Sequence, residues 1–231
     1  PPYLGFVGAF VSCIRRHNYV VLLHDSYPEL AVWVGKIKKN GLIDRVWQWC
    51  NKVMYKRAKQ TIVLSEAAKQ LVCNNYGSDS DRIHVIPNWA DPNELVPKPK
   101  TQSTFAEEHD LVEPFTLLYS GNLGLYYEFD MILDAAEELL DEQFKLVFTG
   151  AGGQRSYIEK QINARKLTNT LLLPYQPQST FNDSLNSCDA LLVTIAKGID
   201  GISFPSKLYT SLSVGKPIIA FSSPNSELRL K

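Results

Sequence analysis

The sequence predicts an α/β fold of two Rossmann-like domains, each with a parallel sheet, facing each other across a cleft. Short apolar runs alternate with amphipathic stretches along the chain, which is the pattern of parallel α/β units. A polar segment with several prolines, residues 92–114, interrupts this alternation. The 231 residues, 45% of them hydrophobic, suffice for the cores of two small domains. We therefore expect a partial first domain with its linker over residues 1–100 and a second domain over residues 111–231, both truncated.

The first domain is expected to contain strands that are short apolar runs, at residues 19–23, 61–64 and 82–86. Helical periodicity predicts helices between them, over residues 29–39, 42–58 and 66–75. The last of these helices has a signal at each end, since Ser65 is a suitable N-cap and Gly77 a suitable stop. The N-terminal apolar stretch 1–14 is too short to cross a bilayer, which needs roughly 20 apolar residues.

The second domain is expected to contain five buried strands, at residues 115–119, 144–149, 170–173, 190–195 and 217–221. Helices are predicted over residues 129–140 and 155–166, and residues 224–231 resemble the start of another helix. Continuous apolar runs separated by helices are typical of a parallel sheet that is covered on both faces.

The net charge of zero hides an asymmetry between the two halves. Residues 1–100 hold 14 Lys and Arg against 8 Asp and Glu, whereas residues 101–231 hold 10 against 16. Most of the positive excess lies in the stretch 33–59, which also contains the aromatic residues Trp33, Trp47, Trp49 and Tyr55. A basic aromatic helix can lie on an anionic membrane surface. The alternative is a core-facing stripe with a solvated basic back, formed by Ile43, Trp47, Cys50 and Met54.

Several classes of site are not indicated. The four cysteines lie far apart without paired spacing, which indicates neither a zinc site nor disulfides and favours a cytoplasmic location. No Asp-x-Asp pair offers an obvious metal cradle, so no metal is expected. The glycine signatures of nicotinamide enzymes and of P-loop kinases are also missing. We expect no cofactor and no nucleic-acid partner.

Two glycine-containing loops follow expected strands of the second domain, where ligands of parallel sheets bind. The first contains Gly121, Asn122 and Gly124, and the second contains Gly150 and Gly152. Glycines let backbone N–H groups approach a phosphate or a sugar closely. The alternative is that both loops are tight turns between a strand and a helix.

Two further loops carry candidate ligand contacts. Tyr175 could stack on a base, with Gln176 beside it, although their loop could equally be only a rigid turn. The segment from Gly201 to Pro217 is the most informative, because Lys207 stands where a helix is expected to begin. A lysine there opposes the helix dipole and calls for an anionic partner such as a diphosphate. We assign Ser203, Pro205, Ser206, Lys207 and Thr210 to this donor site; a solvated lysine beside an ordinary cap is the alternative.

In the first domain, His24 and Asp25 follow directly after the strand expected at 19–23. A histidine at this position can bind a sugar hydroxyl or a developing charge. A lone histidine after a strand can equally be structural. We treat His24, Asp25 and Lys207 as the candidate catalytic residues.

Five motifs recur in an order and spacing that resembles glycosyltransferase family 4. They are IPNWAD at 86–91, YSGNLG at 119–124, FTGAG at 148–152, LPYQP at 173–177 and PSKLY through GKPII at 205–219. The stretch HDSYPE at 24–29 resembles the corresponding stretch in one bacterial branch of this family, whose members act in exopolysaccharide and colanic-acid synthesis or transfer amino sugars. The resemblance implies the GT-B fold, with the nucleotide on the second domain, the acceptor on the first, a retaining outcome and no required metal.

The chain also departs from this family at positions that matter for charge. Many members have Arg and Lys where this chain has Asn122 and Tyr127, and two glutamates where it has Ile202 and Thr210. We hypothesise that Lys207, with Ser206 and the helix start, stabilises the departing diphosphate instead.

The expected function is sugar transfer from a nucleotide-diphosphate donor to a lipid-linked or saccharide acceptor in polysaccharide biosynthesis. The expected place is the cytoplasm, with the stretch 33–59 on the inner face of the plasma membrane. Two alternatives stay open, a nucleotide-sugar epimerase of the same fold and an inactive nucleotide-sugar-binding scaffold.

Overall fold

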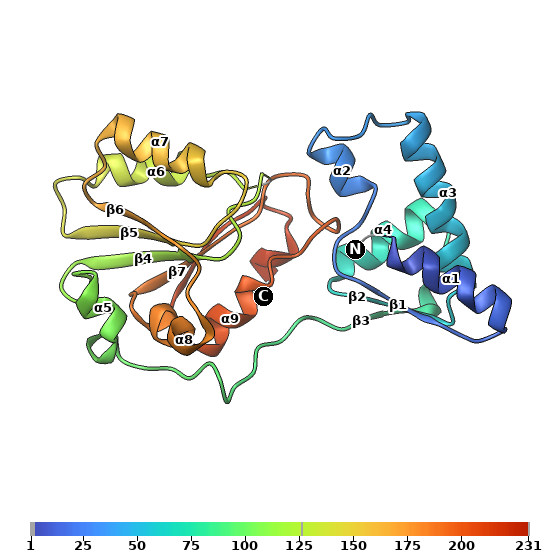
Figure 1. Ribbon diagram of the computed structural model, residues 1–231, viewed down its shortest axis with the longest axis horizontal. Helices are drawn as coiled ribbons and strands as arrows, with labels where there is room; N and C mark the ends of the chain where they lie inside the picture. The colour runs from blue at the N-terminus through green and yellow to red at the C-terminus, as the bar shows by residue number, and fades with distance from the viewer. Residues whose placement is uncertain (1–2, 126, 231) are drawn as a thin grey trace. The chain divides into compact units, whose positions relative to one another are not determined.

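The computed structural model describes residues 3–125 and 127–230, which form two compact units (Figure 1). Unit 1 consists of Pro1–Asn88 with two later segments, Lys197–Phe204 and Ser223–Lys231. Unit 2 consists of Trp89–Ala196 and Pro205–Ser222. The units differ from the predicted ranges because residues 89–100 belong to unit 2 and because the chain returns to unit 1 twice.

Unit 1 is built on a parallel sheet with strand order β1-β2-β3. The strands are β1 (Val20–Leu23), β2 (Gln60–Val63) and β3 (Ile83–Val85). Its helices are α1 (Leu4–Arg15), α2 (Glu29–Trp33), α3 (Leu42–Arg57) and α4 (Glu66–Tyr76), with short 3-10 turns at Ser80–Arg82 and Glu227–Leu230. The three predicted strands are confirmed, and the helix predicted from 224 onward is only the last of these 3-10 turns.

The core of unit 1 lies where α3 and α4 pack on the sheet, around the buried Val63, Val72 and Ile83. Helix α4 begins and ends as predicted. The Ala68 N–H donates to Ser65 Oγ at 3.1 Å, and Gly77 takes a left-handed conformation with φ 62°.

Two helices of unit 1 differ from the expectation. Residues 4–15 form α1. This helix was not predicted, because the stretch 1–14 is rich in glycine and proline. The helix predicted over 29–39 is wrong in its second half, since α2 ends at Trp33. Gly35 has φ 73°, and the N–H groups of Lys36 and Ile37 both turn back to the Ala31 carbonyl. A left-handed glycine thus ends the helix early.

Unit 2 contains a parallel sheet with strand order β6-β5-β4-β7-β8. The strands are β4 (Phe115–Ser120), β5 (Phe144–Thr149), β6 (Thr170–Leu173), β7 (Ala190–Thr194) and β8 (Ile218–Phe221). All five predicted strands are confirmed. The chain builds β4, β5 and β6 outward in one direction and then crosses over to place β7 and β8 on the other side of β4. The switch in direction therefore lies between β4 and β7.

Helices cover both faces of this sheet (Figure 1). One face packs on α6 (Asp130–Glu138) and α7 (Arg155–Arg165) through a core that includes Tyr119 and Phe148. The other face packs on α5 (Thr104–Glu108) and α8 (Gln178–Asn186), and α9 (Lys207–Ser213) completes unit 2. The predictions of α6 and α7 are confirmed, whereas α5 and α8 were not predicted.

The segment predicted to be a domain junction is tied to unit 2 by side chains. Lys100 Nζ donates to Asp189 Oδ2 at 2.6 Å and to the Pro114 carbonyl at 2.7 Å. The Lys98 N–H donates to Asn186 Oδ1 at 2.7 Å. These contacts explain why the residues before 100 join unit 2.

Candidate functional site

The loops that follow β4 and β7 flank the switch point of the unit 2 sheet. Parallel α/β sheets bind ligands beyond the carboxyl ends of their strands at such a point, because adjacent loops separate there and leave room. Residues 121–124 follow β4, and residues 195–206 follow β7 and lead into α9. The topology alone therefore selects this edge as the candidate site in unit 2.

The two glycine loops are held together by backbone hydrogen bonds. The Gly121 N–H donates to the Thr149 carbonyl at 2.9 Å, and the Leu123 N–H donates to the Ala151 carbonyl at 2.8 Å. A Cβ at position 150 would lie 1.9 Å from the Gly121 oxygen, and one at 152 would lie 2.3 Å from the Leu123 oxygen. Glycine is thus required at 150 and 152 by the packing of one loop on the other. Phosphate binding by these loops stays a prediction. The N–H groups of Gly121 and Leu123 are not among the expected phosphate donors, because they already donate to the other loop.

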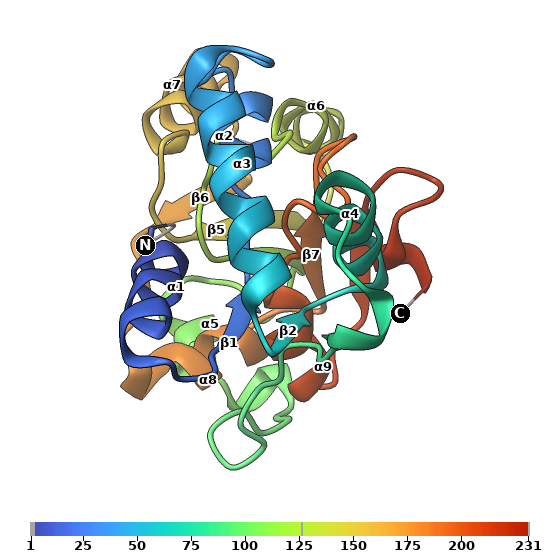
Figure 2. The same cartoon turned by 90° about the vertical axis from the view of Figure 1, so that its right-hand side faces the viewer.

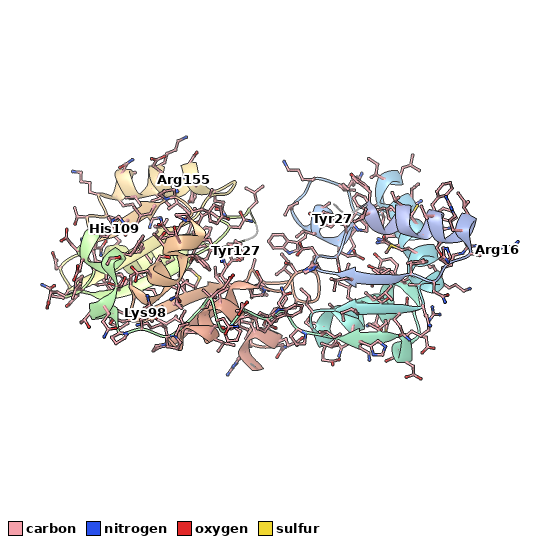
Figure 3. The ribbon with its side chains drawn as sticks, turned by 60° about the horizontal axis from the view of Figure 1, so that its bottom comes forward. Arg16, Tyr27, Lys98, His109, Tyr127 and Arg155 are labelled. Atoms are coloured by element: carbon pink, nitrogen blue, oxygen red, sulfur yellow. The ribbon has the colours of Figure 1, made fainter. Side chains whose placement is uncertain are left out.

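Lys207, the first residue of the seven-residue helix α9, reaches back to the first of these loops. A Cβ at Gly121 would lie 3.4 Å from Lys207 Cε and 3.7 Å from Nζ. The ammonium lies over two aromatic rings, 3.6 Å from the centroid of Tyr119 and 4.3 Å from that of Tyr127 (Tyr127 is labelled in Figure 3). Lys207 therefore joins α9 to the loop after β4.

The Lys207 ammonium is buried, and no residue in the described part of the chain accepts a hydrogen bond from it. Burial lowers the pKa of Lys207 well below its ordinary value, because a charge without solvent or a counter-ion is disfavoured. Thr149 Oγ1, at the end of β5, is likewise buried without a described partner. An anion placed at this edge would satisfy the ammonium and restore its charge.

Sequence reasoning missed three residues of this site. Tyr119 was predicted only as part of a buried strand. Tyr127 was noted only as a position where the chain departs from glycosyltransferase family 4. Thr149 is the last residue of another buried strand. The available signal was topological, since the residues that end adjacent parallel strands lie at one edge.

The other predicted residues of unit 2 lie on the loops of the same edge. The Asn122 carbonyl accepts from Tyr119 Oη at 2.7 Å, and the Gly124 carbonyl accepts from Gln154 Nε2 at 2.9 Å. After β6, Tyr175 is 53% exposed, and Gln176 Nε2 donates to the Pro174 carbonyl at 3.0 Å. An exposed tyrosine at this edge agrees with the base-stacking role predicted for it, which stays a prediction.

The predicted donor segment 201–217 does not lie in one unit. Residues 201–204, which include Ser203, belong to unit 1, whereas 205–217 belong to unit 2. Gly201 has φ 76°, and a Cβ there would lie 2.6 Å from the Ala67 carbonyl oxygen of α4. The Ile202 carbonyl accepts from the Ser26 N–H at 2.7 Å. This segment is therefore divided between the two units.

The start of α9 differs in detail from the expected cap. Pro205 is buried, and Ser206 is exposed at the N-cap position without a side-chain capping bond. Thr210 Oγ1 donates to the Lys207 carbonyl at 2.9 Å, within the helix itself. The Lys207 ammonium, in contrast, is left without a described hydrogen-bond acceptor.

His24 and Asp25 lie in unit 1, immediately after β1, and both are exposed. They stand at the carboxyl end of their strand, as predicted. No group of three His, Cys, Asp or Glu side chains that could hold a metal occurs in residues 3–125 and 127–230. Over the same residues, no helix is long and apolar enough to pass through a membrane.

Comparisons with known proteins agree with the predicted resemblance. The family model for glycosyl transferases group 1 matches residues 101–227, and the model for glycosyltransferase family 4 matches residues 2–94. A probable glycosyltransferase of Pseudomonas aeruginosa, WbjE, is 26% identical over 91% of this chain and 52% of its own length. A protein of Escherichia coli K12 named as a colanic acid biosynthesis glycosyl transferase, WcaI, is 31% identical over 48% of this chain and 28% of its own length. The chain thus spans about half of WbjE and less of WcaI.

Solved structures share the fold. Anabaena Alr3699/HepE, in complex with UDP and glucose, superimposes with a TM-score of 0.78 at 20% identity, over 100% of this chain and 60% of that one. Sucrose-phosphate synthase from Thermosynechococcus elongatus gives a TM-score of 0.72 at 15% identity, over 93% of this chain and 54% of that one. These likenesses confirm the predicted α/β fold with two parallel sheets.

Proposed function

Because the chain belongs to the glycosyl transferases group 1 family, we propose that the protein transfers a sugar from a nucleotide-diphosphate donor to a lipid-linked or saccharide acceptor in polysaccharide biosynthesis. Two observations outside the site support this proposal. WbjE and WcaI are named as glycosyltransferases, the latter of colanic acid biosynthesis, and the similar structure of HepE contains UDP and glucose.

The observation that carries the proposal is the buried ammonium of Lys207. When a nucleotide-diphosphate leaves a sugar, negative charge collects on the departing phosphate. An ammonium that has no described hydrogen-bond acceptor, at the switch point of a parallel sheet, is placed to accept that charge. Because the site is shielded from water, the attraction is stronger there than on a surface. Lys207 then lowers the barrier more than it strengthens donor binding.

The position of Tyr127 supports this assignment. The resemblance leads us to expect a lysine at 127, and the chain has a tyrosine there. Lys207 Nζ lies 4.3 Å from the centroid of that tyrosine ring. We infer that α9 supplies the positive charge that the loop after β4 lacks.

The proposed reaction is retaining. The bond between the anomeric carbon and the diphosphate oxygen breaks, and the acceptor hydroxyl forms its new bond to that carbon on the same face. The departing phosphate takes the hydroxyl proton. His24 or backbone groups of unit 1 steady the sugar, and Asp25 belongs to the same loop. Linkage analysis that shows an inverted anomeric centre would refute this course.

The test compares Lys207→Met with Lys160→Met in the full-length protein. Methionine keeps the apolar stem of lysine and removes the charge, and Lys160 is exposed on α7. We expect Lys207→Met to lower kcat by about a hundredfold or more, as removal of one preorganised charge-stabilising group does, while Lys160→Met keeps the native rate. Labelled donor and acceptor are followed together. Equal rates for the two variants contradict the role of Lys207, and donor conversion without acceptor supports the epimerase instead.

We also propose that α3 contacts an anionic membrane surface. The predicted core stripe is only partly correct, because Met54 is buried while Ile43 is 64% exposed. Leu42, Val46 and Trp49 of α3 (the helix is labelled in Figure 2) are also exposed. The basic side chains beside them are also exposed: Arg45, Lys52, Lys56 and Arg57. An apolar stripe with basic flanks is the composition of an interfacial helix.

Helix α1 extends the apolar character of this surface. It packs on α3 and, within its described residues, has no buried side chain. Its exposed apolar residues are Leu4, Val7, Phe10, Val11 and Ile14. Exposed apolar area of this kind is typical of a surface that binds a membrane or another protein. With the basic flanks of α3, it favours the cytoplasmic face of a membrane as the place of action.

A further inference from the structure

The loop that carries His24 and Asp25 is held by a partly buried hydrogen-bond network in unit 1. This loop, residues 24–28, connects β1 to α2. Its Tyr27 carbonyl accepts a hydrogen bond from Asn51 Nδ2 of α3. The same nitrogen donates to Tyr76 Oη of α4 at 2.9 Å. One amide therefore connects the loop to two helices.

Glu29 closes the network from the other end of the loop. Tyr76 Oη donates to Glu29 Oε1 at 2.6 Å, and Asn75 Nδ2 donates to the same oxygen at 3.1 Å. Burial, and after it the charge of Glu29, raises the pKa of Tyr76. The hydroxyl thus keeps its proton and stays a donor. The network runs from Tyr27 through Asn51 and Tyr76 to Glu29.

This network is costly for stability. Glu29 Oε2 is buried and has no partner within the described residues, and a buried polar atom left unsatisfied costs about 1–3 kcal/mol. Apolar side chains of similar size often replace buried ionic groups without loss of stability. What the polar groups provide, and apolar ones do not, is a single geometry for the loop.

A second set of contacts holds the loop from a different direction. The Ser26 N–H donates to the Ile202 carbonyl at 2.7 Å, and Ser26 itself is 1% exposed. The ring of Tyr27 stacks on Trp47 with centroids 5.8 Å apart (Tyr27 is labelled in Figure 3). Only the side chains of His24 and Asp25 are left exposed. A rigid backbone that presents two polar side chains to solvent is how binding groups are usually held.

We propose that Glu29, Asn51 and Tyr76 are positioning residues, which hold the backbone of residues 24–28 so that His24 and Asp25 meet the acceptor sugar in one orientation. This inference rests on the proposed function for the identity of the ligand. The positioning itself is a property of unit 1 and is measured without any ligand.

The experiment uses the full-length protein with Tyr76→Phe, Glu29→Gln and Glu29→Leu. Tyr55→Phe is the matched control. Tyr55, on α3, is buried like Tyr76, and its ring lies 5.1 Å from that of Tyr76. No hydrogen bond joins Tyr55 to the network in the residues that the structure describes. Amide hydrogen exchange at residues 24–30 reports the order of the loop, and exchange in β2 reports the rest of unit 1.

We expect Tyr76→Phe and Glu29→Leu to speed exchange at 24–30 by about tenfold, with β2 unchanged. In Glu29→Gln the amide oxygen still accepts from Tyr76, so exchange stays native. In transfer assays with Tyr76→Phe and Glu29→Leu, kcat/KM for the acceptor falls by about ten- to a hundredfold, while the Kd for UDP is unchanged.

Two results overturn the inference. One is native exchange at 24–30 in both Tyr76→Phe and Glu29→Leu. The other is an equal effect of Tyr55→Phe, which reduces the network to ordinary core packing. If the unmodified protein transfers no sugar, the proposed function fails, yet the exchange measurement still decides whether the network positions the loop.

Discussion

The ammonium of Lys207 lies 3.6 Å from the centroid of the Tyr119 ring. A ring face attracts a cation, and this attraction offsets part of the cost of burying it. It does not replace a counter-ion, because the effective penalty for burying a charge is several kcal/mol. The charged form of Lys207 in unit 2 therefore has a cost in free energy, which a bound anion removes.

Replacing Lys207 with Met is therefore expected to stabilise the folded protein in the absence of donor. The pKa of Lys207 is lowered in the folded state, so at neutral pH the unfolded chain binds the proton more tightly. Stability then rises with pH between the lowered pKa and the ordinary value of 10.5. Below that window the free-energy cost of burying the charged Lys207 is complete, and the Lys207→Met substitution removes this cost.

Urea unfolding at pH 7 and at pH 10 measures this effect. We expect Lys207→Met to gain about 1 kcal/mol or more at pH 7 and a smaller amount at pH 10. A variant that is less stable than the native protein at pH 7 means that the ammonium already has an anionic partner.

The packing of the two glycine loops predicts a large effect at position 150. In Gly150→Ala the new Cβ would meet the Gly121 carbonyl oxygen at 1.9 Å, so one loop must move away from the other. We expect a loss of about 3 kcal/mol in the free energy of unfolding, measured by urea denaturation.

Gly8→Ala is the control for this substitution. Gly8 lies within α1, where an added Cβ would meet nothing within 4 Å. Alanine there is expected to gain about 0.5–1 kcal/mol through helix propensity. A Gly150→Ala protein as stable as the native one contradicts the close approach of the loops.

The sequence was informative wherever a local pattern decides the structure. Strands β5 and β6 have the predicted bounds, because each is a largely apolar run that turn residues end. The ends of α4 were readable for a similar reason, since Ser65 and Gly77 act within one turn of the helix.

Features that depend on distant contacts were not readable. Helix α8 has the polar sequence QSTFNDSLN, and Asn182 and Asn186 of this helix bind the backbone of residues 96–98. Lys207 and Tyr119 are far apart in sequence, and only the crossover that places β7 beside β4 brings them together. For the same reason, no local pattern indicated that residues 197–204 pack in unit 1.

The contact between Lys100 and Asp189 is expected to stabilise unit 2. The lysine side chain is only 10% exposed, and Asp189 also accepts from the Thr116 N–H at 2.7 Å. Lys100→Met leaves that carboxylate without its cation, and we expect a loss of about 2 kcal/mol in urea unfolding.

Lys98→Met provides the comparison for Lys100→Met. Its Nζ lies 4.0 Å from Asp183 Oδ1, and its side chain is 44% exposed. Exposed pairs of this kind contribute roughly 0–1 kcal/mol. Equal losses for the two variants contradict a special role for the buried pair.

The surface of α3 predicts a dependence on anionic lipid. We expect the full-length protein to sediment with vesicles that contain phosphatidylserine, and to do so less as salt rises. Each basic residue near such a surface contributes about 1 kcal/mol. Changing Lys52 and Lys56 together to Gln should therefore weaken binding by about thirtyfold. Changing Lys145 and Lys160 of unit 2 to Gln should not weaken it.

Trp49→Ser should weaken binding to anionic vesicles without altering its salt dependence, because it removes buried apolar area and no charge. Binding that is equal for neutral and anionic vesicles excludes the electrostatic contribution.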